Sequence, residues 1–146
     1  MKLLVALDLS PITEIILKTV KILAKKSKAE VTLLHVLQPD PDFVGYGVGP
    51  QAERDFVAKK IQENRASVQS LAGELAKEGL QVTPVVIQGN TVDTILEEAD
   101  KIEADMIVTG SHGYGMMYKL FVGSVSKEVL KNSRRPVLII PVRNKD

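Results

Sequence analysis

The sequence predicts an α/β protein built on a parallel β-sheet with helices on both faces. Five short apolar runs alternate along the chain with four segments whose apolar residues recur every three or four positions. Apolar runs without polar alternation are typical of strands buried on both faces, as in parallel sheets. The strict alternation of strand and helix implies parallel strands joined by crossover helices. At 146 residues, we expect a single domain over residues 1–146 with a buried core.

The first part of the chain predicts a strand, a helix and a second strand. Leu3–Leu7 is a continuous apolar run that Asp8 closes, and it is the first predicted strand. Ser10 and Pro11 then favour a helix start, with Ser10 as N-cap and the proline at the first helical position. Glu30–Leu37 is the second predicted strand.

The middle of the chain predicts a loop, a long helix and an edge strand. Gln38–Pro50 is rich in proline and glycine, so we expect a loop that either lies over a ligand or only connects its neighbours. Helical spacing of apolar residues predicts a helix over Ala52–Glu78, which Gly79 ends and whose lysines are interpreted as a solvated face. Val82–Ile87 is the third strand, where Pro84 favours an edge position or a local break because proline cannot donate to a ladder.

The last part of the chain predicts two more helices and two more strands. Asn90 or Thr91 can cap the third helix. We expect the fourth strand at Met106–Thr109, the end of the fourth helix near Asn132, and the fifth strand at Val137–Ile140. The third helix carries one apolar stripe, formed by Val92, Ile95, Leu96, Ala99 and Ile102.

Composition narrows the class of protein. The formal net charge is +1, which is too close to balance to indicate nucleic acid or an anionic membrane surface as a partner. The chain has no cysteine, so disulfides and thiolate chemistry are excluded. The apolar N-terminal run is too short for a signal peptide or a membrane span. These observations favour a cytoplasmic protein.

A glycine-rich stretch, Thr109–Ser124, separates the fourth strand from the fourth helix. It contains Gly110, Gly113 and Gly123, the last followed by Ser124. Glycine lets a ligand approach bare backbone, and a turn that feeds a helix N-terminus gathers unpaired N–H groups. Such groups suit an anion, most often a phosphate. The stretch therefore predicts a phosphate-binding cradle.

Asp8 and Gly110 each follow a predicted strand. Ligands of parallel sheets bind beyond the carboxyl ends of the strands, where the winding direction reverses, so the two residues would flank one crevice if the chain reverses between their strands. The sequence has neither G-x-G-x-x-G after the first strand nor G-x-x-x-x-G-K-[ST], which disfavours dinucleotide and P-loop sites. Simpler roles remain open: Asp8 at the first helix start, Ser124 as N-cap, and the glycines as turn formers.

The spaced glycines resemble the ATP-binding signature of the universal stress protein family. The matching motif is Gly110-Ser-His-Gly113, then nine residues, then Gly123-Ser124. The resemblance covers the whole chain. It extends to Val5-Ala-Leu-Asp8-Leu-Ser10, His35-Val36, Gly89-Asn90 and Pro136-Val-Leu-Ile-Ile-Pro141.

The resemblance implies a Rossmann-like adenine nucleotide-binding fold. It is a three-layer sandwich of four helices around a five-stranded parallel sheet of order 3-2-1-4-5, with the first and fourth strands adjacent. It also implies roles: Asp8 near the ribose, Gly110 against it, Val36 offering backbone groups to the adenine edge, and Ala6 and Thr109 near the base. The residues implied to hold the phosphates, mainly through backbone N–H groups, are Gly113, Gly123, Ser124 and Val125.

The resemblance implies a stress-response or regulatory module that binds ATP or another adenine nucleotide, sometimes with Mg²⁺ or Mn²⁺. A cation on a triphosphate needs few protein ligands. Hydrolysis is expected to be slow or absent, because no residue that would orient a water is evident and His112 has no evident nucleophile and carboxylate partners. A weak ATPase and a nucleotide-free interaction module remain alternatives. Val137–Val142 is expected to be an outer strand that pairs two copies into a homodimer.

Overall fold

The computed structural model describes residues 1–39, 50–111 and 122–142. Gly113, His112 and most of the predicted loop Gln38–Pro50 lie outside the described residues. The described elements are β1 (Lys2–Leu7), α1 (Thr13–Ser27), β2 (Glu30–Leu37), α2 (Pro50–Lys77), β3 (Gln81–Gln88), α3 (Thr91–Lys101), β4 (Met106–Gly110), α4 (Ser124–Asn132) and β5 (Val137–Ile140).

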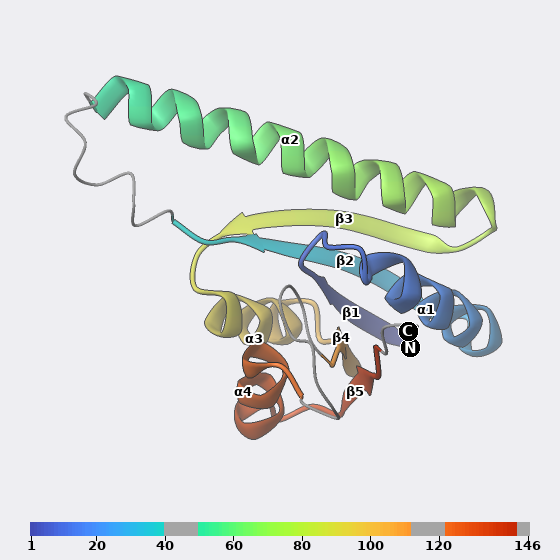
Figure 1. The fold of residues 1–146 in the computed structure, drawn as a ribbon. Coiled ribbons are helices and arrows are strands. Elements are labelled where there is room, and N and C mark those ends of the chain that lie inside the picture. Colours follow the sequence, from blue (N-terminus) through green and yellow to red (C-terminus); the bar gives the residue numbers. More distant parts are fainter. Residues whose placement is uncertain (40–49, 112–121, 143–146) are drawn as a thin grey trace.

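The strands form one sheet of order β3-β2-β1-β4-β5, in which every neighbouring pair is parallel. Figure 1 shows the sheet between two helical layers, with α1 and α2 on one face and α3 and α4 on the other. The predicted fold class, strand order and helix number are therefore confirmed. β1 lies between β2 and β4, so the winding direction reverses at β1 and β4, as predicted.

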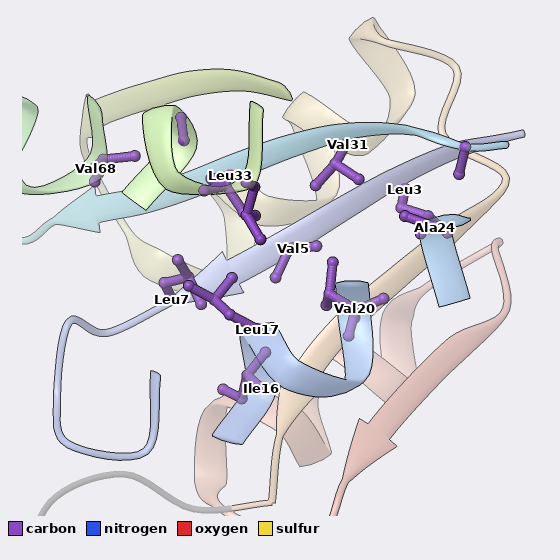
Figure 2. Packing of buried hydrophobic residues seen from close by; sticks show 14 of the residues in the cluster. Leu3, Val5, Leu7, Ile16, Leu17, Val20, Ala24, Val31, Leu33 and Val68 are labelled. Carbon is purple, nitrogen blue, oxygen red and sulfur yellow. The ribbon is translucent and has the colours of Figure 1, made fainter. Parts of the chain in front are cut away.

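Successive residues of β1 fill two separate cores. Leu3, Val5 and Leu7 pack against α1 and α2, and Figure 2 shows them beside the α1 residue Val20. Leu4, on the opposite face, packs with residues of α3 and α4. Leu3, Leu4 and Val5 are fully buried. Burial on both faces explains why this strand is apolar throughout rather than alternating.

The start of α1 differs from the prediction. The helix begins at Thr13, the N-cap position is Ile12, and no side chain caps it. The Ser10 hydroxyl is buried without a hydrogen-bond partner in the described parts of the chain. Instead, the Ser10 N–H donates to Asp8 Oδ1 at 2.9 Å, and the Ser10 carbonyl accepts from the Thr13 N–H. The Asp8 side chain thus fixes a turn before the helix, and the predicted cap at Ser10 is wrong.

The long helix α2 begins at Pro50, two residues before the predicted start. A proline is favoured there because the first helical N–H has no helical partner. Gly79 follows the helix at φ +88°, in the left-handed region that favours glycine and in which helices commonly end. No helix in the described ranges is long and apolar enough to cross a membrane.

Two local predictions around β3 are confirmed. β3 is an edge strand, and Pro84 within it pairs in register with Leu33 of β2. Of the two candidate caps for α3, Asn90 holds the position, because its side-chain oxygen accepts the Asp93 N–H at 3.0 Å.

A buried hydroxyl pair joins the end of β4 to the first turn of α4. Ser126 Oγ donates to the Gly110 carbonyl at 2.6 Å and lies 2.9 Å from Thr109 Oγ1. A hydroxyl has one proton, so the Ser126 oxygen accepts the Thr109 proton while donating its own. Both side chains are buried. This chain of hydrogen bonds fixes the start of α4 against the end of β4.

Glu78 joins α1 to the end of α2. Its carboxylate accepts from Lys21 Nζ at 2.6 Å and from Lys25 Nζ at 2.9 Å. Hydrogen bonds from Lys21 and then Lys25 lower the pKa of Glu78 below its ordinary value of 4.5. The charged form is therefore favoured in the folded protein.

We predict that Ser126→Ala destabilises the fold by about 1–2 kcal/mol, because it removes a buried donor and leaves the Gly110 carbonyl with weaker partners. Urea denaturation followed by circular dichroism measures the change. Ser70→Ala on the exposed surface of α2 is the control and should change stability by less than about 0.5 kcal/mol. Equal stability of the wild type and Ser126→Ala would contradict the role of this hydroxyl.

We also predict a pH-dependent contribution from Glu78. Its folded-state pKa is lowered, so the unfolded chain takes up the proton first as pH falls. The stabilisation is complete above the unfolded pKa and is lost as pH falls through the folded pKa. Glu78→Gln should lower Tm at pH 7 and lose that effect progressively below about pH 4.5. Glu74→Gln, in the last turn of α2 just before Glu78, is the control; a pH-independent gap between wild type and Glu78→Gln would contradict the prediction.

Candidate functional site

A cavity of about 740 Å³ opens at the carboxyl ends of β1, β2 and β4. β1 and β4 pair only as far as Val5 and Val108, although each strand continues for two more residues. The strands therefore separate at their carboxyl ends, and the cavity lies at this reversal point of the sheet. Its volume lies within the range of about 300–1,000 Å³ that is usual for small-molecule sites.

The open edge of β2 forms one wall. β2 pairs with β1 only up to His35 and with β3 up to Leu37. The Leu37 carbonyl accepts from the Gly89 N–H, on the β3 side. Because successive carbonyls of a strand alternate in direction, the Val36 carbonyl points to the other side, where β1 has ended. Val36 therefore offers a backbone acceptor at the cavity, as the predicted contact to a base edge requires.

Side-chain hydrogen bonds fix the floor on this side. His35 Nδ1 lies 2.8 Å from the Leu7 carbonyl, which can only accept, so Nδ1 carries the proton and donates. Gln38 Nε2 donates to Thr91 Oγ1 at 2.8 Å and so ties the end of β2 to the start of α3. All four residues line the cavity.

The opposite wall is the N-terminus of α4. The first helical hydrogen bond runs from the Lys127 N–H to the Gly123 carbonyl. The N–H groups of Ser124, Val125 and Ser126 precede it and have no acceptor within the helix. All three residues line the cavity. These N–H groups have no acceptor among the described residues, and together with the positive end of the helix dipole they favour an anion here.

Ser124 is the first residue of α4 rather than its cap, because the cap position is Gly123 and no side chain caps the helix. The simpler reading of Ser124 as an N-cap is therefore wrong. The Gly123 N–H donates to the Ser111 carbonyl, so it is not among the unpaired donors of this helix end. Because glycine has no side chain, Gly123 leaves space in the cavity at the start of α4.

Gly110 lies close to two isoleucine side chains. A Cβ there would lie 2.9 Å from Ile16 Cδ1 and 3.1 Å from Ile12 Cδ1. Both atoms are the ends of flexible side chains, so a residue with a Cβ would fit at this position only after these two side chains shifted. Asp8 lies across the cavity mouth, is exposed, and accepts the Ser10 N–H with one carboxylate oxygen.

The structure brings the predicted site residues together. Eight of the nine line the one cavity, and the ninth, Gly113, lies outside the described residues. The hydroxyl of Thr109 is hydrogen-bonded to Ser126, so this polar residue places no unpaired hydroxyl at the cavity. The eight are Ala6, Asp8, Val36, Thr109, Gly110, Gly123, Ser124 and Val125.

Sequence reasoning missed several lining residues, of which Lys60 carries a charge. The spacing in the sequence could have indicated that Lys60 lies near the cavity. Lys60 follows Val57 by three positions and precedes Asn64 by four, and both of these residues are partly buried. Lys60 therefore flanks the partly buried stripe of α2, although Lys60 itself is exposed. Gln38, Thr91 and Ser126 had no comparable signal, because their partners are distant in sequence.

A second groove, of about 900 Å³, lies between α1 and α2. It contains none of the predicted site residues, and the lysine Lys21 on its rim is paired with Glu78. Among its described lining residues, the groove has the N-terminus of α1 but no carboxyl end of a strand. It is therefore a weaker candidate for a ligand site than the cavity between β1 and β4. Across the described ranges, no group of three or more His, Cys, Asp or Glu side chains is arranged to hold a metal ion.

Comparison with known proteins agrees with the fold. The sequence model of the universal stress protein family matches residues 1–141. Universal stress protein MJ0577 of Methanocaldococcus jannaschii is 29% identical over 155 residues, which cover 98% of this chain and 96% of MJ0577. The solved structure of MJ0577 matches with a TM-score of 0.85 at 30% identity, covering 99% of this chain and 97% of that one.

Two more distant structures share the fold and were solved with nucleotides. A family protein of Arabidopsis thaliana with AMP bound gives a TM-score of 0.70 at 20% identity, over 99% of this chain and 93% of that one. The universal stress protein of Archaeoglobus fulgidus in complex with dAMP gives 0.65 at 23%, over 96% and 97%. The match of the family model to nearly the whole sequence shows that the chain belongs to the universal stress protein family.

Proposed function

We propose that the protein binds an adenine nucleotide in the cavity between β1 and β4 and acts as a regulatory module. The observation that carries the proposal is the convergence of a backbone acceptor at Val36 and unpaired helix N–H groups at Ser124 and Val125 on one cavity. A base edge and a phosphate are the two ends of a nucleotide, and the cavity offers each end a matching group.

In this proposal the base lies against Val36, with Ala6 and Thr109 beside it, and the ribose lies between Asp8 and Gly110. The phosphates lie at the N-terminus of α4, where Ser124 and Val125 donate N–H groups and the Ser124 hydroxyl adds a further donor. Gly113 belongs to the same proposal from the sequence motif. The AMP and dAMP complexes of the two distant relatives support an adenine nucleotide as the ligand class.

ATP is the proposed ligand, because the sequence signature resembles the ATP-binding signature of the family. When bound with the triphosphate, Mg²⁺ or Mn²⁺ would screen the phosphate charge, and Asp8 is the carboxylate in the described lining of the cavity. The lining supplies N–H and O–H groups that can donate hydrogen bonds to phosphates. Among the described lining residues, we identify no group suited to orient a water molecule for hydrolysis. We therefore propose that the protein holds ATP with slow or no hydrolysis, and that binding biases a conformational equilibrium in the cytoplasm.

We also propose a homodimer formed through β5. β5 is an outer strand of the sheet, next to β4. The carbonyls of Pro136 and Ile140 accept from β4 and from Ser111, so these positions face the sheet. The backbone groups of Val137 and Ile139 alternate with them and face the free edge, where a second copy can pair.

Isothermal titration calorimetry tests the ligand. We expect saturable binding of ATP, and a loss of at least about tenfold in Gly123→Val, because branched carbons would occupy the space at the end of α4. Gly123 has φ −56° and ψ 157°, which valine also adopts, so the backbone tolerates the change. Gly73→Val is the matched control, since a Cβ at Gly73 meets nothing within 4 Å. Full ATP affinity in Gly123→Val would sink the proposed site.

Light scattering tests the dimer. We expect a dimer at micromolar concentration and a monomer in Ile139→Pro, because proline removes an edge-facing N–H and leaves the hydrogen bonds to β4 in place. Ile139→Ala is the control: it truncates the same side chain but keeps the N–H, so it should remain largely dimeric. A monomeric wild type, or a dimeric Ile139→Pro, would remove the proposed interface.

A further inference from the structure

The N-terminal half of α2 packs little against the sheet. The buried residues of this 28-residue helix are Val68, Ala72 and Leu75, all in its C-terminal half. Figure 1 shows that the helix begins beyond the carboxyl ends of β2 and β3, at the side of the sheet where the cavity opens. A helix half that projects past its sheet gains little stability from core packing.

Lys60, in this projecting half, lines the cavity. It is the only lysine or arginine among the described lining residues, and Asp8 is the only carboxylate. Lys60 forms no ion pair with the described residues. Its Nζ lies 5.7 Å from the centre of the Phe56 ring, one turn earlier on the helix. The ring restricts the ammonium group without neutralising its charge, which leaves that charge available to a ligand.

The charge of the cavity suggests what Lys60 binds. A nucleotide with several phosphates would bring negative charge close to Asp8, and this repulsion needs compensation. The α4 N-terminus supplies partial positive charge from one side. Lys60 supplies a full positive charge from α2, an element that the sequence motif does not include. An uncharged nucleoside would gain nothing from this lysine.

We propose that Lys60 is a phosphate-binding residue that makes the site favour nucleotides of high negative charge over the nucleoside, and that its contact ties the projecting half of α2 to the bound ligand. This inference rests on the proposed nucleotide site and deepens it. In this proposal, the preference for a charged ligand comes from a residue of α2. The N-terminal half of α2 would then be more rigid when phosphates are bound than when they are absent. The link supplies a physical route from ligand charge to the outer surface of the protein.

The test compares Lys60→Gln, Lys60→Arg and Lys59→Gln by calorimetry with ATP and with adenosine. Lys59 is exposed, does not line the cavity, and carries the same charge, so its variant controls for net charge. We expect Lys60→Gln to weaken ATP binding about three- to tenfold, with the loss shrinking at high salt, and to leave adenosine binding unchanged. Lys60→Arg should recover most of the ATP affinity.

Hydrogen exchange supplies a second measurement on the same proteins. ATP should increase amide protection over residues 50–64 of the wild type more than adenosine does, and Lys60→Gln should lose that difference. Equal losses for ATP and adenosine in Lys60→Gln, or losses matched by Lys59→Gln, would overturn the role of Lys60 while leaving the nucleotide site standing. A wild type that binds neither ATP nor adenosine would instead overturn the proposed function and this inference with it.

Discussion

The early end of the pairing between β1 and β4 is the constraint on which the site depends. The two strands are hydrogen-bonded only as far as Val5 and Val108, and beyond that pair each continues beside its other neighbour. The separation exists because the chain winds in opposite directions on the two sides of this pair, so that no crossover covers the gap. Everything proposed for the ligand lies in the space that results. The β2 edge, the Asp8 turn and the α4 N-terminus line one cavity because β1 ends before β2 and separates from β4.

The two ends of the cavity differ in how they are built. At the β2 end, recognition would use a backbone carbonyl whose direction the sheet register dictates, so side-chain identity matters little there. At the α4 end, it would use N–H groups whose position depends on side chains: the hydroxyls of Thr109 and Ser126 attach the helix start to the Gly110 carbonyl. Preorganised donors of this kind bind an anion without first losing conformational freedom. The buried hydroxyl pair thus fixes the position of the N–H groups that would bind the anion.

The fold followed from the sequence because strand runs, helix stripes and stop residues are local signals that tertiary contacts here reinforce. The helix start at Ser10 was misplaced because the Asp8 carboxylate competes for the Ser10 N–H and forms its own turn, which a Ser-Pro motif does not reveal. The predicted site residues came from the family resemblance and the reversal-point rule, and the described ones line one cavity. The Thr109–Ser126 bond spans 17 positions, and the approach of Lys60 depends on how far α2 projects, so neither has a local signature.

The hydrogen bond between the Ser111 carbonyl and the Gly123 N–H joins two residues within the glycine-rich stretch, twelve positions apart. Ser111 is also anchored to β5, since its N–H donates to the Ile140 carbonyl and its Oγ accepts from the Val142 N–H. The residue before α4 is therefore tied to the sheet through Ser111, and the first turn of α4 is tied to β4 through the Thr109–Ser126 hydroxyl pair. Two separate sets of hydrogen bonds thus locate the N–H groups at the start of α4 before any ligand arrives.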